Sequence, residues 1–153
     1  MLLLLAVVAG VSAGLRSMTP LAVTAWAAQS WPAVQQSGLA FMAAPAAAYV
    51  LTVLAVGELI ADKLPFVPSR LTPGPLIGRI VSGALCGAVV AAAAPQAMIV
   101  PALAGAIGGL AGSYGGHAAR RHFSVIRKLP DLAVALAEDA VAIALALFAV
   151  SRI

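Results

Sequence analysis

The sequence predicts an all-α integral membrane protein, built as one membrane domain over residues 1–153 from a bundle of five to six transmembrane or re-entrant helices. Apolar residues make up 63% of the chain and charged residues only 9%, and the mean hydropathy is +1.06. Apolar runs fill almost the whole length, separated by short segments rich in Pro, Gly or Arg. This pattern is typical of helices in a bilayer.

The composition also excludes several classes of function. Nine Lys and Arg outnumber five Asp and Glu, but the basic residues fall mainly in short loops, without the aromatic-interleaved stripe of a nucleic-acid surface. Cys86 stands alone, so it can form no internal disulfide and is expected to pack in a helix. We find no motif for a metal, a cofactor or a catalytic nucleophile. We therefore predict neither an enzyme nor a nucleic-acid partner.

The N-terminal part allows two interpretations. In the first, residues 1–15 form a retained apolar segment, which lacks the basic start of a signal peptide, and a second helix covers 20–31. Thr19 would cap that helix, with Pro20 at its first position. In the second, residues 1–29 form one span that buries Arg16, and the bundle has five helices.

The remaining helices are predicted at 46–64, 80–94, 98–114 and from 130 or 131 to 150. The connections 63–79 and 119–128 carry most of the basic residues. By the positive-inside rule these two loops are cytoplasmic. The prediction is thus a multi-pass protein of the inner membrane, with the C-terminus outside.

A carboxylate motif occurs twice in the chain. Glu58 closes an apolar run, and Glu138 lies 80 residues later in a segment that matches it in small and apolar residues. The 80-residue offset relates the first three helices to the last three, and because three is odd the two copies would have opposite orientations. We therefore predict an inverted repeat of three plus three helices, covering 1–75 and 76–153, as in many transporters.

An ionised carboxylate inside a membrane helix costs ~2.5 to 3.5 kcal/mol on the insertion scale, so such residues usually mark an ion path. Glu58 and Glu138 are predicted at one depth, where they could share a proton or bind a cation. Asp62, one turn after Glu58, and Asp139 would be auxiliary residues of the same proton or cation site. The alternative is structural: salt bridges from Glu58 to Arg16 or Arg79, and from Glu138–Asp139 to Arg120 or Arg127.

Two further segments have a functional and a structural interpretation. Arg16, Ser17 and Thr19 precede a helix N-terminus, which favours an anion site or, alternatively, a turn with a topology-setting charge. Arg16 and its neighbours, together with Lys63, would act as charge partners or as a gate. The glycines of 105–116 favour close helix packing, with a pore-lining broken helix as the alternative.

Three segments resemble a known family. They are Gly14-Leu15-Arg16-Ser17-Met18-Thr19-Pro20, the run from Gly57 to Pro65 with Pro68-x-Arg70, and Glu138-Asp139. They are similar to the bacterial family catalogued as domain of unknown function 4126 (DUF4126). The resemblance implies a small multi-span inner-membrane protein and no established activity. A distant architectural likeness to inverted-repeat cation transporters rests on the Glu58 and Glu138 segments.

Together these features predict a small membrane transporter or channel that moves a cation or protons along a path lined by Glu58, Asp62, Glu138 and Asp139. The expected partners are the lipid bilayer, a small inorganic ion and further copies of the chain, because one small protomer has little surface to enclose a path. One alternative is a non-transporting scaffold or assembly subunit with structural ion pairs. Another is an anion pathway at Arg16.

Overall fold

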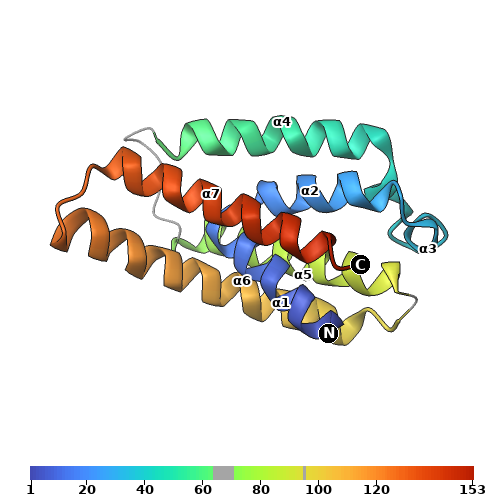
Figure 1. Cartoon of the computed structure of the whole chain (residues 1–153). Helices are drawn as coiled ribbons and strands as arrows, with labels where there is room; N and C mark the ends of the chain where they lie inside the picture. Colours follow the sequence, from blue (N-terminus) through green and yellow to red (C-terminus); the bar gives the residue numbers. More distant parts are fainter. Residues whose placement is uncertain (64–70, 95) are drawn as a thin grey trace.

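The protein is a bundle of helices (Figure 1). The computed structural model describes residues 1–63, 71–94 and 96–153, and all regular elements in these ranges are helical. The α-helices are α1 (Leu2–Leu15), α2 (Met18–Ala28), α3 (Pro32–Gln35), α4 (Pro45–Ala61), α5 (Pro73–Ala93), α6 (Ile99–Arg120) and α7 (Asp131–Val150), with a 3₁₀ turn at Ala40–Ala43 and a π-helical segment at Arg121–Ile126.

The N-terminal part forms two helices rather than one span. The chain leaves helical geometry at Arg16, which is extended with φ −142° and ψ 114°, and α2 then runs back toward the end where α1 began (Figure 1). The predicted cap is wrong in detail, because α2 begins at Met18 and Thr19 lies inside it with no side-chain cap. The acceptors for the first N–H groups come from another helix, as described below.

The later helices follow the predicted order with different limits. α4 and α7 lie close to prediction, whereas α5 begins at Pro73, so Arg79 is a buried helical residue and not part of a loop. α6 continues past Gly115 into the π-helical segment, and no proline interrupts the chain between Gly115 and Pro130. Much of the two expected basic loops is therefore helical. The motif residues 64–70 and Pro95 lie outside the described residues.

The centre of the bundle is a close contact of α1, α5 and α6. Glycines from all three helices make it possible, since a Cβ at any of them would overlap the backbone of a neighbouring helix: Gly10, Gly14, Gly83, Gly87, Gly105, Gly108 and Gly112. Small residues let helix backbones approach in this way. The prediction of close packing for the glycines of 105–112 is confirmed, and α6 is unbroken there.

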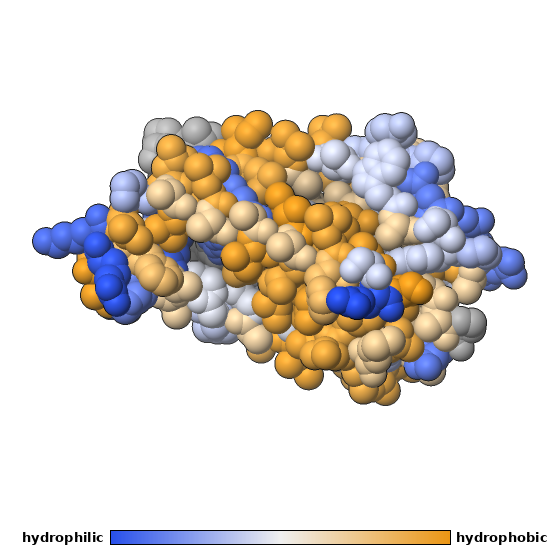
Figure 2. All heavy atoms as spheres, viewed as in Figure 1, coloured by the Kyte–Doolittle hydropathy of each residue, from blue (hydrophilic) through white to orange (hydrophobic). Residues whose placement is uncertain are grey.

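The face of the bundle shown in Figure 2 is largely apolar. Leu103, Ile107 and Leu136 are each more than half exposed. Three helices are long and apolar enough to cross a membrane, namely Pro73–Ala93, Ile99–Ile126 and Asp131–Val150, and α1, α2 and α4 are shorter apolar helices. These properties are compatible with a membrane location.

The two termini and the α6–α7 turn lie at opposite ends of the bundle (Figure 1). Both termini lie at one end. The end of α4, the start of α5 and the turn between α6 and α7 lie at the other. α4 packs mainly on α2 and runs opposite to α7. The two helices that carry the acidic residues thus bring them toward the same end.

We expect Gly112→Ala to destabilise the bundle and Gly115→Ala, three residues along the same helix, to leave it nearly unchanged. A Cβ at 112 would overlap Val11 O of α1, whereas one at 115 meets nothing within 4 Å. Overpacking of this kind costs about 1–3 kcal/mol. The buried Cys86 thiol reports unfolding, so a thiol-reactive dye should label the first variant at a lower temperature. Equal labelling curves would contradict the glycine contact.

Candidate functional site

Arg16, at the break between α1 and α2, is fully buried with an exposed fraction of 0%. Its Nε donates to Asp139 Oδ1 at 2.6 Å, and its Nη1 donates to Asp62 Oδ2. Glu138 Oε2 lies 3.9 Å from Nη2. A guanidinium keeps its proton in proteins, so these acidic neighbours compensate a permanent buried charge.

Lys63 adds a second cation to this group. Its Nζ donates to Asp139 Oδ2 at 2.6 Å and to the Leu59 carbonyl at 2.7 Å. The two oxygens of Asp139 are therefore shared between Arg16 and Lys63. Lys63 is more accessible than Arg16, with 24% of its side chain exposed. We call Arg16, Asp62, Lys63, Glu138 and Asp139 the buried charge cluster.

Glu58 caps the N-terminus of α2, which follows the break at Arg16. Its two carboxylate oxygens accept the backbone N–H groups of Ser17 and Met18, both at 2.8 Å. The first N–H groups of a helix have no partner within the helix and carry partial positive charge, which a carboxylate complements. A side chain 41 residues away in sequence thus starts α2.

Arg79 closes the other side of the break. Its Nη1 donates to the carbonyls of Gly14 and Leu15, at 2.7 and 2.6 Å, at the C-terminus of α1. Its Nη2 lies 3.9 Å from Glu58 Oε1. A cation is favourable at a helix C-terminus for the same electrostatic reason that an anion is favourable at an N-terminus. The end of α1 and the start of α2, which meet at Arg16, are therefore both capped by charged side chains.

The acidic residues singled out in the sequence meet near the break, but with different partners. Asp62 and Asp139 bind Arg16, whereas Glu58 serves the start of α2 and contacts Arg79. Arg120 binds Asp131 at 2.6 Å rather than the Glu138–Asp139 pair. Among the described residues no group of three or more His, Cys, Asp and Glu side chains is arranged to hold a metal ion.

The remaining predicted residues have backbone or packing contacts. Ser17 contributes its N–H to Glu58. Thr19 is buried, and its hydroxyl finds no hydrogen-bond partner within the ranges that the structure describes. Neither side chain reaches the charge cluster through an observed hydrogen bond.

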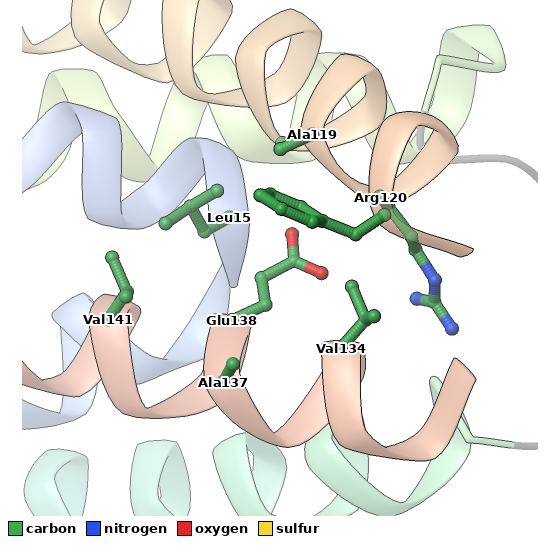
Figure 3. Close-up of a pocket in the computed structure, with 9 residues that line it drawn as sticks. Leu15, Ala119, Arg120, Val134, Ala137, Glu138 and Val141 are labelled. Carbon is green, nitrogen blue, oxygen red and sulfur yellow. The ribbon is translucent and has the colours of Figure 1, made fainter. Parts of the chain in front are cut away.

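Glu138 also lines a cavity of about 200 Å³. The walls come from α1, α6, the π-helical segment and α7, and include Leu15, Ala119, Phe123 and Val134. Figure 3 shows the Glu138 carboxylate directed into the space between Leu15 and Ala119, while the Arg120 guanidinium is turned away. The cluster thus reaches a cavity through one of its acids.

The family model described as "Domain of unknown function (DUF4126)" matches residues 3–152. The chain belongs to this family. No curated protein and no solved structure matches it. The matched range includes all five residues of the buried charge cluster and, apart from the first residue of α1, both helices that meet at Arg16. For this DUF4126 protein the expected family is therefore confirmed, and the family description supplies no activity.

The sequence predicts the position of Arg79 wrongly. It predicts a loop residue that is one alternative partner of Glu58, whereas Arg79 lies in α5 with 4% exposure. Thr72 followed by Pro73 is a helix-start signal that would have placed Arg79 in a helix of this DUF4126 chain. Its contact with the α1 carbonyls depends on tertiary packing and has no sequence signature.

We expect Arg16→Gln and Asp139→Asn each to destabilise the protein strongly, because each leaves a buried charge without its partner. Breaking a buried pair costs about 3–5 kcal/mol. The double variant should lose less than the sum of the two single losses, since the residues interact directly. The matched control is Asp131→Asn, a change at an ion pair in which Asp131 is 60% exposed, and there the effect should be small.

Thermal unfolding followed by Cys86 labelling gives these differences. Additive losses in the double variant would contradict a direct Arg16–Asp139 interaction, and so would an Asp131→Asn variant that is as unstable as Asp139→Asn.

Proposed function

We propose that this protein is a small membrane transporter or channel that moves a cation or protons, with the buried charge cluster as its working site. The observation that carries the proposal is the meeting of Asp62, Asp139 and Glu138 with Arg16 and Lys63 at a helix break inside an apolar bundle. Ionisable groups in such surroundings are costly and usually serve an ion path.

The helix break supports this proposal. In many transporters, interrupted helices expose N–H groups and carbonyls that bind the substrate and coupling ions. Here Glu58 accepts hydrogen bonds from the N–H groups at the start of α2, and Arg79 donates to carbonyls at the end of α1. In the proposed mechanism this arrangement would be the closed state, and Glu58 and Arg79 would have to move away from these backbone groups for an ion to bind there.

The sharing of Asp139 suggests how the site would work. Lys63 is the more accessible of its two cationic partners, so an entering cation or proton would displace Lys63 more easily than the fully buried Arg16. Lys63 would act as a gate, and Arg16 as a fixed counter-charge. Glu138 and Asp62 would complete the path on either side of Arg16.

We also propose the inner-membrane topology with six crossing or re-entrant helices, the inverted repeat of residues 1–75 and 76–153, and a homo-oligomer. The opposite directions of α4 and α7 and the position of both termini at one end (Figure 1) support the repeat. The exposed Arg121, Arg127 and Lys128 near the α6–α7 turn favour a cytoplasmic position for that end.

Cysteine labelling tests this topology. In a Cys86→Ala background, we expect Ser151→Cys to react with a membrane-impermeant maleimide in intact cells, and His122→Cys to react only after permeabilisation. Both sites are exposed, and neither change alters a Lys or Arg. Labelling of His122→Cys in intact cells would reverse the proposed orientation.

A second candidate is a non-transporting scaffold, in which the same charges only hold the helices together. It is favoured by one specific observation: Glu58, Asp62 and Asp139 each interact with a basic side chain or with backbone N–H groups. The anion pathway has less support, because acidic side chains surround Arg16.

A measurement of ion flux distinguishes the transporter or channel from the non-transporting scaffold. We expect proteoliposomes of the wild type to pass protons or a cation, detected with pH- and cation-sensitive dyes, and Asp139→Asn to abolish this flux. Asp131→Asn is the matched control and should retain it. Size exclusion with light scattering verifies folding and gives the oligomer mass.

If Asp139→Asn fails to fold, Lys63→Gln replaces it, because Lys63 is partly exposed and its loss should change flux before stability. Absence of flux for protons, monovalent cations and divalent cations in well-folded wild type would overturn the transport proposal and favour the scaffold.

A further inference from the structure

The cavity between α6 and α7 is open to the outer surface of the bundle. α6 packs extensively on α1 and α5 and touches α7 only slightly. Ala119, Phe123, Ala137 and Val141 line the cavity and are themselves exposed. Exposed apolar side chains of membrane helices face the hydrocarbon of the bilayer. A ligand of this cavity would therefore enter from the lipid.

The walls of the cavity suit a hydrocarbon chain. Its charged lining residues have partners within the protein: Glu138 Oε2 lies 3.9 Å from Arg16 Nη2, and Arg120 donates to Asp131 at 2.6 Å. The surface that remains is almost wholly apolar. Apolar cavities of about 150 Å³ stay dry and bind ligands such as benzene. A volume of about 200 Å³ thus admits part of one acyl chain.

Arg127 and Lys128 lie next to this cavity, where α6 turns into α7. Arg127 follows the lining residue Phe123 by four positions, about one helical turn, so both lie on one side of the segment. The Leu129 N–H donates to the Phe123 carbonyl at 3.1 Å, which holds Lys128 beside the same turn. Both basic residues are exposed, and no acidic side chain pairs with them within 1–63, 71–94 and 96–153.

The turn also has the composition of a segment at the membrane interface. Val125 and Ile126, next to the basic pair, are 67% and 65% exposed. Apolar side chains of this kind enter the boundary of the acyl region, while Arg and Lys reach the head groups. The cavity extends from the turn toward the interior of the bundle, as far as Val141 in α7. The basic pair and the cavity thus match the head group and the acyl chain of one lipid.

We infer that this side of the bundle is a binding site for one anionic phospholipid, with part of one acyl chain in the cavity and the phosphate on Arg127 and Lys128. Basic residues at a cytoplasmic pocket between membrane helices are suited to anionic head groups. The inference rests on the membrane location in the proposed function and not on transport. Lipid binding is measured without flux, so the two proposals can fail separately.

Native mass spectrometry of the detergent-solubilised full chain tests the head-group contact. We expect one phosphatidylglycerol per protomer to bind about tenfold or more tighter than phosphatidylcholine with the same acyl chains. Arg127→Gln should weaken phosphatidylglycerol binding by about fivefold, the effect of one basic residue near a lipid head group. The matched control is Arg121→Gln. Arg121 is exposed but lies two positions from Phe123, on the other side of the segment, so its variant should bind nearly as the wild type.

Ala119→Leu tests the acyl-chain contact, because it fills the cavity from α6 without changing a charge. Ala118→Leu is the matched control, since Ala118 is exposed and is not part of the cavity wall. We expect only Ala119→Leu to lose the bound lipid, with folding verified by Cys86 labelling. If Ala119→Leu fails to fold, the exposed Arg127→Gln still decides the test. Equal binding of the two lipids, equal losses in Arg127→Gln and Arg121→Gln, or unchanged binding in folded Ala119→Leu would each overturn the inference.

Discussion

The rest of the structure depends on the ion pairs that the buried Arg16 forms with Asp62 and Asp139. A fully buried guanidinium must be neutralised, because a charge without a partner in a medium of low dielectric is strongly unfavourable. Asp62 and Asp139 meet this need from α4 and α7, helices that belong to different halves of the chain. One cation in the N-terminal part therefore fixes the positions of two distant helices.

The same logic extends to the backbone at the helix break. Interrupting a helix leaves N–H groups and carbonyls unpaired on either side, and burial makes them costly. Glu58 and Arg79 satisfy them from α4 and α5. Each charged side chain is thus stabilised by the break that it caps, so the break and the charges depend on one another. An ion path and a scaffold would both use these contacts, and they differ in whether the Lys63–Asp139 pair can open.

Much of the fold could be predicted from local sequence signals. The apolar runs and Asp131 at the start of α7 indicated the helices, and the glycines of α6 indicated close packing. The errors have physical causes. The N-cap prediction for Thr19 failed because a distant carboxylate took that role. The helix α6 was predicted too short because Gly115 and Gly116 indicated its end, although no proline follows before Pro130.

The sequence by itself determined the composition of this protein, the order of its helices and the types of residue that meet in its interior, because hydropathy and residue chemistry are local properties. Only the tertiary structure decided the partners. The pairing of Arg16 with Asp62 and Asp139, the capping of α1 by Arg79 and the placement of Glu138 on a cavity depend on contacts between residues up to 123 positions apart. Such contacts follow from helix packing in three dimensions, where several acidic and basic residues compete for one another and only the geometry selects among them.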